Sequence, residues 1–230
     1  MKSLSFKRHR FPADVIRHAV WLYFRFSLSF RDVEEPLAQR GIEVSYETIR
    51  CETIKFGPLI ARRLKRSRPA PSPRGHLDEM VCSIGGERMC LWRAVDDEGE
   101  VLDLVVQRRP DTEAALRLLR RLLLNQPVEP QTITTDGLAS YGAALDQLEL
   151  RHVHRPGRLR ENNRIDNSHL PIRRRERQQQ RFKSQASARR FLTTHAAIYN
   201  TFNIQRHLIS GPTLRRFRAG AATAWDAAVA

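Results

Sequence analysis

Three aspartates occupy positions from which their carboxylates could bind metal ions together. Asp78 lies near the start of a short, β-prone stretch, residues 76–84, which Pro73 and Gly75 precede and Gly85 and Gly86 follow. Asp136 directly follows a second such stretch, 131–135, and Asp166 lies in an arginine-rich helical segment. Taken alone, Asp78 is better explained as an edge residue that faces water, because an ionised aspartate is costly to bury without a partner. Three carboxylates carried by two strands and a helix, however, predict a site for divalent cations, which prefer oxygen ligands.

The basic residues indicate a polyanionic partner for such a site. The 230-residue chain has 40 Lys and Arg against 25 Asp and Glu, a net charge of +15 and a pI of about 11.0. Residues 61–74 contain six basic residues and no acidic one, and residues 151–183 contain eleven basic and three acidic ones. A charge that only maintains solubility would be spread evenly, so these two stretches predict a path for a phosphate backbone.

Cysteine content and hydropathy indicate a cytoplasmic protein. The three cysteines, Cys51, Cys82 and Cys90, are an odd number without metal-ligand spacing, and we expect them to be reduced. Cys82 and Cys90 are expected as small core residues on facing strands. No run of 18 or more apolar residues occurs, and no hydrophobic segment follows the basic start. We therefore expect a protein that is neither membrane-embedded nor secreted, with enough apolar content (41%) for one sizeable and one small domain.

The first 60 residues are predicted to form a small all-α, helix-turn-helix domain. Helical periodicity and capping residues predict three helices, at 13–26, at 29–39 and from residue 45 onward. The last helix of this motif reads the major groove with its N-terminal residues, which here include Thr48 and Arg50. A three-helix bundle that binds nothing is the alternative. Pro36 conflicts with a regular second helix, because an interior proline removes a hydrogen bond.

Residues 61–74 are predicted to be a basic, proline-rich linker that is extended and semi-rigid. An inert spacer is one explanation. The charge favours a segment that lies along DNA, with contacts from Arg62, Arg63, Lys65, Arg66 and Arg68.

From residue 75 the pattern is α/β and predicts a ribonuclease-H-like catalytic domain, which is a mixed five-stranded sheet with flanking helices. The strands are expected at 76–84, 89–95, 101–107, 131–135 and 152–154, and the helices at 111–125, 138–148, 161–182 and 184–207. This domain is expected to span residues 75–210. Residues 211–230 are expected to be a weakly held C-terminal tail, alanine-rich from Gly220 onward.

The motifs around the three aspartates resemble those of the DDE transposases of bacterial insertion sequences. The resemblance rests on segments 76–79 (HLDE), 91–96 (LWRAVD), 135–142 (TDGLASYG) and 161–169 (ENNRIDNSH). Within that class the chain is most similar to the IS-six family, whose members combine a helix-turn-helix with a compact integrase-type catalytic core. The resemblance covers roughly residues 5–210.

The resemblance implies a transposase that binds the terminal inverted repeats of its element and nicks each end. The freed 3′-hydroxyls would then attack target DNA and give a cointegrate. Asp78, Asp136 and Asp166 would be the catalytic and metal-binding residues, holding two Mg²⁺ ions for which Mn²⁺ would substitute. The implied partners are double-stranded DNA and a second copy of the chain, in the bacterial cytoplasm and associated with the nucleoid.

Basic residues close to the third aspartate are expected to contact phosphates, because the guanidinium fork matches phosphate oxygens. A solvated helix face is the alternative explanation. These residues are Arg164, Arg173, Arg174, Arg175 and Arg177.

The chain departs from the family pattern at its third acid. The family has a glutamate where this chain has Asp166, which is one methylene shorter, and misplacement on that scale can cost about 10²-fold in rate. The family commonly has a tryptophan in the helix that here contains residues 51–53. An alternative is therefore a catalytically decayed transposase that acts only as a DNA-binding protein or repressor. A metal-dependent nuclease that cuts without joining is a third possibility.

Overall fold

The structure is a computed structural model that describes residues 4–157, 163–179, 181–204 and 209–230, without the side chains of residues 163, 164 and 166–168. The chain forms two compact units. One contains Pro69–Leu192, and the other contains Met1–Arg68 together with Thr193–Ala230. The second unit therefore joins the two ends of the chain, whereas the sequence predicted boundaries at residues 60, 74 and 210.

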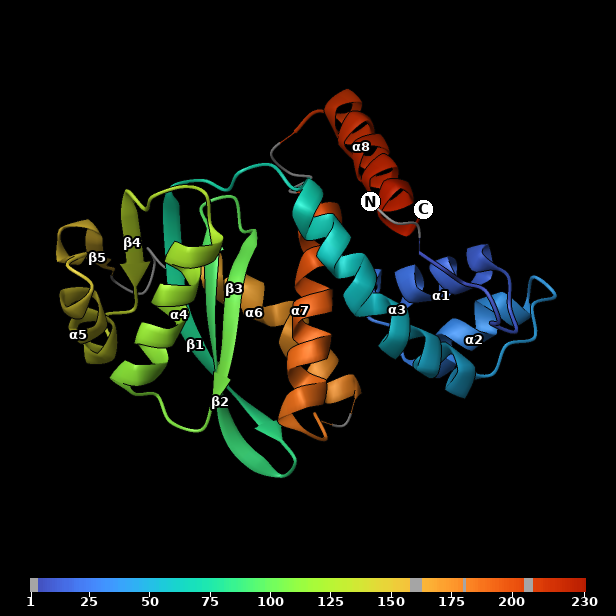
Figure 1. The fold of residues 1–230 in the computed structure, drawn as a ribbon, viewed down its shortest axis with the longest axis horizontal. Coiled ribbons are helices and arrows are strands. Elements are labelled where there is room, and N and C mark those ends of the chain that lie inside the picture. The colour runs from blue at the N-terminus through green and yellow to red at the C-terminus, as the bar shows by residue number, and fades with distance from the viewer. Residues whose placement is uncertain (1–3, 158–162, 180, 205–208) are drawn as a thin grey trace. The chain divides into compact units, whose positions relative to one another are not determined.

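A five-stranded mixed sheet forms the centre of the 69–192 unit (Figure 1). Its strands are β1 (Arg74–Ile84), β2 (Glu87–Asp96), β3 (Val101–Gln107), β4 (Thr132–Thr135) and β5 (His154–Pro156). The spatial order is β3-β2-β1-β4-β5, with β1 to β3 antiparallel, β4 parallel to β1 and β5 parallel to β4. This arrangement confirms the predicted α/β, ribonuclease-H-like fold class.

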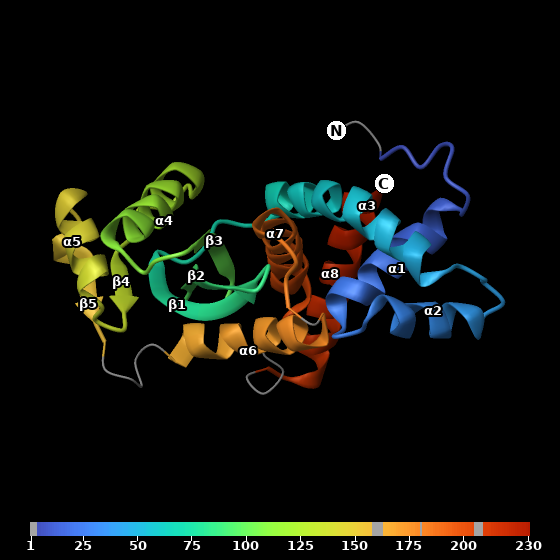
Figure 2. The same ribbon diagram turned by 90° about the horizontal axis from the view of Figure 1, so that it is seen from below.

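Helices cover both faces of the sheet. α4 (Thr112–Asn125) and α5 (Ala139–Gln147) pack on one face, and α6 (Asn163–Gln178) lies along β1 and β2 on the other (Figure 2). Asp111 begins α4, because its side chain accepts the Ala114 N–H at 2.9 Å. The core under α4 and α5 includes Trp92 and Tyr141, whose rings meet edge to face with centroids 5.1 Å apart.

The edge of β1 next to β4 is covered only in part. β4 pairs with the first four residues of β1 and ends opposite Leu77. Beyond Leu77, the next pairing on this edge among the described residues is at Ile84, which bridges to Phe182. A stretch of β1 between these two points therefore lacks a strand partner there, and this exposes it to a ligand.

The other unit is helical. It contains α1 (Ala13–Arg25), α2 (Phe30–Ala38), α3 (Tyr46–Ser67), the end of α7 (Gln185–Phe202) and α8 (Gly211–Val229). A capping box begins α2: the Ser29 hydroxyl accepts the Asp32 N–H, and the Asp32 carboxylate accepts the Ser29 N–H at 2.8 Å. The three predicted N-terminal helices are therefore present. Pro36 lies inside α2, two residues before its end, so this helix forms without the hydrogen bond that a backbone N–H at this position would donate.

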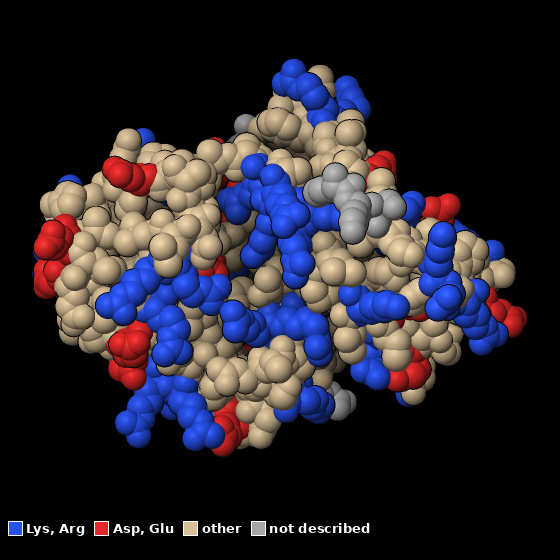
Figure 3. All heavy atoms as spheres, viewed as in Figure 1, with Lys and Arg blue, Asp and Glu red and all other residues tan. Residues whose placement is uncertain are grey.

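The third helix is longer than predicted, since α3 continues to Ser67 and residues 61–67 are not extended. Pro58 lies inside α3 and the next proline is Pro69, and the Arg and Lys residues between them are good helix formers, so the helix continues over residues 61–67. Buried Ile60 and Leu64 give this part of α3 an apolar face. Lys and Arg side chains gather over the second half of α3 (Figure 3).

The C-terminal residues are also more ordered than predicted. Residues 211–229 form α8, which begins with the Ser210 hydroxyl accepting the Thr213 N–H. Trp225 is buried, and its ring lies 6.1 Å from that of Phe202. The alanine-rich sequence is a helix anchored by one large aromatic side chain, and the prediction of a weakly held tail is wrong.

Cys82 and Cys90 are buried on adjacent strands, as predicted. Cys82 lies opposite Met89 and Cys90 lies opposite Val81, so the two thiols point to different faces and remain free. Among the described helices, none combines the length and the hydrophobicity that crossing a membrane requires.

Candidate active site

Parallel pairing of β1 and β4 brings two of the predicted aspartates together. The last pair of the β1–β4 ladder is Leu77 with Thr135, so Asp78 and Asp136 are the next residues on their strands. Asp136 is exposed, and its Oδ1 accepts the Leu138 N–H at 3.0 Å, which fixes the turn into α5. The strand register alone therefore places these two carboxylates at one corner of the sheet.

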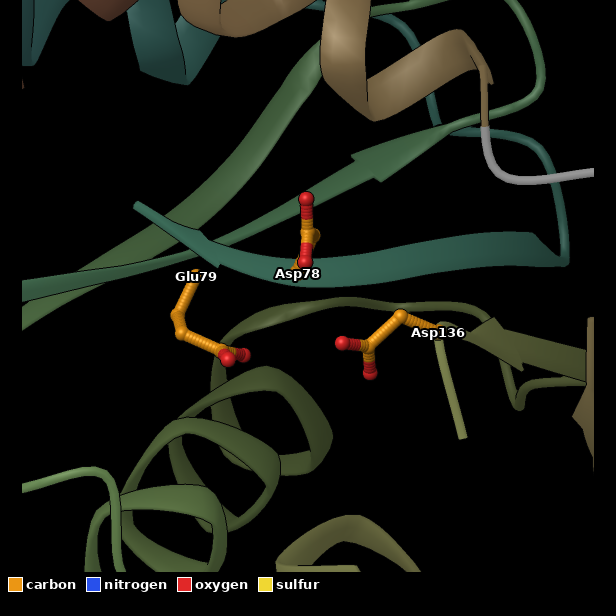
Figure 4. A group of neighbouring side chains, drawn as sticks. All are labelled: Asp78, Glu79 and Asp136. Atoms are coloured by element: carbon orange, nitrogen blue, oxygen red, sulfur yellow. The ribbon is translucent and has the colours of Figure 1, made fainter. Parts of the chain in front are cut away.

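A third carboxylate completes this corner, and it comes from Glu79. One carboxylate oxygen from each of Asp78, Glu79 and Asp136 lies within 4.8 Å of the others. In Figure 4, Glu79 and Asp136 point toward one another beside β1. We call these three residues the acidic corner.

Tyr141 of α5 orients Glu79. The Tyr141 hydroxyl donates a hydrogen bond of 3.1 Å to Glu79 Oε2, across 62 residues of sequence. The Tyr141 ring is fully buried in the core, so its hydroxyl is held in one place. Burial, together with the negative charge of Glu79, raises the pKa of Tyr141 well above 10.0 and keeps this donor protonated.

The acidic corner concentrates negative charge that a cation would relieve. Burial raises the pKa of Glu79, and the nearby Asp136 carboxylate raises it further, while the hydrogen bond from Tyr141 acts in the opposite direction. A divalent cation between these oxygens would remove the repulsion. Three clustered carboxylates are a suitable donor set for such an ion.

The face of the sheet next to α6 contains a buried arginine. Arg93 of β2 lies opposite Asp78 in the β1–β2 register and is only 2% exposed. Directly opposed residues point to the same face, so Arg93 and Asp78 both face α6. His169 of α6 is buried on this side, and burial together with Arg93 and Arg173 lowers its pKa to about 3. His169 is therefore a neutral imidazole at physiological pH.

The third predicted acid lies on α6, the helix that packs on this face. Asp166 is in the first turns of α6, but its side chain is outside the described residues, as is that of Arg164. The structure thus brings Asp78 and Asp136 together and places α6 along β1 and β2.

The predicted DNA contacts near the start of α3 are engaged within the protein. Arg50 donates to both carboxylate oxygens of Glu47, at 2.8 and 2.6 Å. Thr48 is half-buried, and its hydroxyl shares a hydrogen bond of 3.0 Å with the hydroxyl of Ser45, the residue that caps the helix. Both side chains would have to exchange these contacts for DNA contacts.

The basic residues further along α3 differ in exposure. Arg62, Lys65 and Arg66 are exposed, whereas Arg63 donates to the Ala228 carbonyl oxygen at 3.0 Å and so holds α8. Arg68, which directly follows α3, is half-buried.

The arginines of α6 also divide into two kinds. Arg173, Arg174 and Arg177 are exposed, as phosphate contacts require. Arg175 is 1% exposed and lies over the Phe191 ring at 5.3 Å. Helical periodicity turns Arg175 inward, so it would have to leave the Phe191 ring to reach a phosphate, and its contact with DNA stays a prediction.

Sequence reasoning missed Glu79, Tyr141 and Arg93. A signal for Glu79 existed, because strand alternation puts it on the same face as core residue Leu77, where an ionised side chain needs a reason to be present. Tyr141 lies five residues after Asp136 on the next helix, within reach of the same corner. Arg93 lies in a strand that is buried from Met89 to Asp96, and an arginine there is a comparable signal.

Comparison with known proteins agrees with this geometry. A family model described as a DDE domain matches residues 73–205. A transposase for the insertion sequence-like element IS431mec of Staphylococcus aureus is 31% identical over 140 residues, which are 61% of this chain and 62% of the relative. The transposase for insertion sequence element IS257 in transposon Tn4003, also from Staphylococcus aureus, has the same identity and coverage.

The fold and the acidic corner define a domain of the DDE class, and the matched residues cover more than half of the chain. The chain belongs to the DDE transposase family of bacterial insertion sequences, and within it to the IS-six family. The match spans 62% of each of these curated relatives.

Proposed function

We propose that this protein is a DNA transposase that cuts and joins DNA strands at the acidic corner. The observation that carries the proposal is the cluster of Asp78, Glu79 and Asp136 in a chain of the DDE family. The finer reaction expected from the sequence is also part of the proposal: nicking at the inverted repeats, followed by attack of each 3′-hydroxyl on target DNA to give a cointegrate.

The residues of the acidic corner fit divalent metal ions. Asp78 and Asp136 would hold the ions with Glu79 as a further oxygen ligand, and Asp166 would complete the set from α6. When bound, two Mg²⁺ ions activate the attacking oxygen and stabilise the leaving oxygen of a phosphodiester. Tyr141 contributes by keeping Glu79 pointed into the corner.

The DNA partner is supported by the distribution of positive charge. Exposed basic residues on α3 and α6 would contact phosphates, with Arg62, Lys65 and Arg66 on the first helix and Arg173, Arg174 and Arg177 on the second. Thr48, Arg50, Arg63, Arg68, Arg164 and Arg175 stay as proposed contacts. A homodimer on DNA is proposed because two element ends must be joined in one reaction.

A strand-transfer assay tests the proposal. The full chain would be incubated with Mg²⁺ or Mn²⁺ and duplex DNA that carries the ends of its own element. We expect nicked and joined products, and their loss in Asp78→Asn. If the DNA is cut but its strands are never joined to a target, the protein is instead a nuclease.

The length of Asp166 favours a second candidate function, which is DNA binding without catalysis. An aspartate in place of the family's glutamate is one methylene short, and the α6 backbone is fixed against the sheet. If Asp166→Glu is active in strand transfer and the natural chain is not, the natural chain is a DNA-binding protein whose shorter side chain at position 166 has abolished catalysis. Activity of both would make aspartate a competent third ligand.

A further inference from the structure

An open hollow of about 820 Å³ adjoins the uncovered part of β1, away from the acidic corner. It is lined by residues from β1, from the β1–β2 hairpin and from the end of α6, namely Val81, Cys82, Ser83, Gly86, Arg88, Glu176, Arg177 and Arg181. Val81 is 43% exposed here, which is unusual for an apolar residue in the first strand of a central sheet. We call this feature the arginine hollow.

Three guanidinium groups converge on the hollow from different elements. Arg88, Arg177 and Arg181 are all exposed, and among the described residues none of them forms an ion pair. Arg88 lies opposite Ser83 in the β1–β2 register, and Arg177 lies in the last turn of α6. The hollow therefore presents positive charge to solvent.

The single acidic residue of the hollow is already engaged. Glu176 Oε1 accepts the Ser83 N–H at 2.7 Å, so its carboxylate serves as a partner for the uncovered edge of β1. Just beyond it, the Phe182 N–H donates to the Ser83 carbonyl and the Gly85 N–H donates to the Phe182 carbonyl. The end of α6 is thus fixed to β1, and the arginines near it are held in a defined place.

Arg181 adopts an unfavourable backbone conformation to reach this place. Its φ is +72°, in the left-handed region that favours glycine. Its N–H donates to the Glu176 carbonyl at 2.8 Å, which reverses the chain after α6. A glycine would make this turn with less strain, so the arginine is better explained by its side chain than by the turn.

We propose that the arginine hollow binds the phosphodiester backbone of the DNA strand that reaches the acidic corner. Val81 is three residues after Asp78 on β1, so the backbone at the hollow is about 10 Å along the strand from that of Asp78. Three exposed guanidinium groups with one engaged acid are complementary to a polyanion. The inference rests on the proposed function and adds Arg88 and Arg181 to its DNA contacts.

The test measures DNA affinity of the full chain by fluorescence anisotropy with a labelled duplex, at salt concentrations between about 50 and 200 mM. The variants are Arg88→Ala, Arg177→Ala and Arg181→Gly. The matched control is Arg120→Ala, which removes an exposed arginine of α4 outside the hollow. Arg181→Gly separates binding from folding, because glycine favours this φ and the thermal midpoint should not fall.

Each hollow variant should weaken binding about eightfold at 0.1 M salt and reduce the salt slope by about 0.9, as for the loss of one phosphate contact. With a labelled single strand the slope should fall by about 0.7. Affinities equal to that of Arg120→Ala, in folded variants, would overturn the inference.

The two proposals fail in different ways. If Asp78→Asn abolishes strand transfer while the hollow variants bind DNA like the control, the inference is wrong and the proposed function stands. If the hollow variants lose affinity in a chain that never transfers strands, the hollow is confirmed and the proposed catalysis is wrong.

Discussion

Two regions of strand β1 carry opposite charge and are built in opposite ways. In the acidic corner, Glu79 is half-buried and is fixed by the buried hydroxyl of Tyr141. In the arginine hollow, Arg88, Arg177 and Arg181 are exposed and their side chains remain available to a ligand. Both regions use an edge of β1 that β4 leaves uncovered after Leu77.

The difference indicates what each region binds. Preorganised oxygens suit a small ion, because a ligand set must be correct to a fraction of an ångström. Exposed arginines suit a chain of phosphates, because affinity there depends on charge more than on one geometry. A short β4 is the common cause, since a longer strand would cover both.

The largest effect is expected from the acidic corner. Asp136→Asn should lower strand cleavage on the order of 10²–10³-fold, as for the loss of one preorganised electrostatic partner. Asparagine retains the side-chain oxygen that accepts the Leu138 N–H, so the turn into α5 should stay intact. Cleavage would be measured on gels with end-labelled DNA, and binding by anisotropy should not weaken. Unchanged cleavage would exclude Asp136 from the chemistry.

Tyr141→Phe tests the orientation of Glu79. The variant keeps the buried ring but loses the hydrogen bond to Glu79, so Mn²⁺ affinity should fall about tenfold, as for loss of an outer-shell partner of a metal ligand. Calorimetric titration with Mn²⁺ measures this. Tyr46→Phe, at an exposed tyrosine of the helical unit, is the control. If Tyr141→Phe and Tyr46→Phe bind Mn²⁺ with equal affinity, the hydrogen bond from Tyr141 is not needed to orient Glu79 as a metal ligand.

The strands β1 and β4 could be predicted from sequence, whereas the contact that orients Glu79 could not. Short apolar stretches bounded by glycine and aspartate identify the strands, which puts Asp78 in the first half of β1 and Asp136 directly after β4. The role of Glu79 depends on Tyr141, 62 residues away, and no local pattern encodes that contact. The hollow depends similarly on where α6 ends against β1.

The predicted extended linker and weakly held tail differ from the structure for another reason. The prolines at 69, 71 and 73 predicted an extended linker from residue 61. The helix α3 instead continues to Ser67, because its apolar face is buried up to Leu64. At the other end, the alanine-rich sequence gives little contrast between apolar and polar positions, and α8 buries Trp225 together with the smaller Ala221, Ala228 and Val229. Burial by residues distant in sequence decided both cases.

The lowered pKa of His169 on α6 predicts how the stability of the fold depends on pH. Its pKa is lowered from 6.5 to about 3 in the folded protein, so below pH 6.5 the unfolded chain binds a proton that the folded chain does not. Stability should therefore fall as pH is lowered from about 6.5 toward 3, and His169→Gln should reduce this fall. Urea midpoints at pH 7 and pH 5 would show it, with the exposed His152→Gln as control. An unchanged pH dependence in His169→Gln would contradict the assignment.

The smallest effect is expected at Glu176. Glu176→Gln keeps an oxygen for the Ser83 N–H and removes one negative charge beside the three arginines. DNA affinity should rise, by less than the about eightfold effect expected for one phosphate contact, and the thermal midpoint should stay close to that of the natural chain. Weaker DNA binding in this variant would show that the edge contact, rather than the charge, controls the hollow.

Mn²⁺ binding to the free protein tests the central claim most directly. Electron paramagnetic resonance distinguishes free from bound Mn²⁺, and it would be applied to the natural chain, to Asp136→Asn and to Glu176→Gln as a carboxylate removed outside the acidic corner. The account predicts that the natural chain and Glu176→Gln bind Mn²⁺ alike and that Asp136→Asn loses this binding. Equal binding by all three proteins would contradict a metal site at the acidic corner.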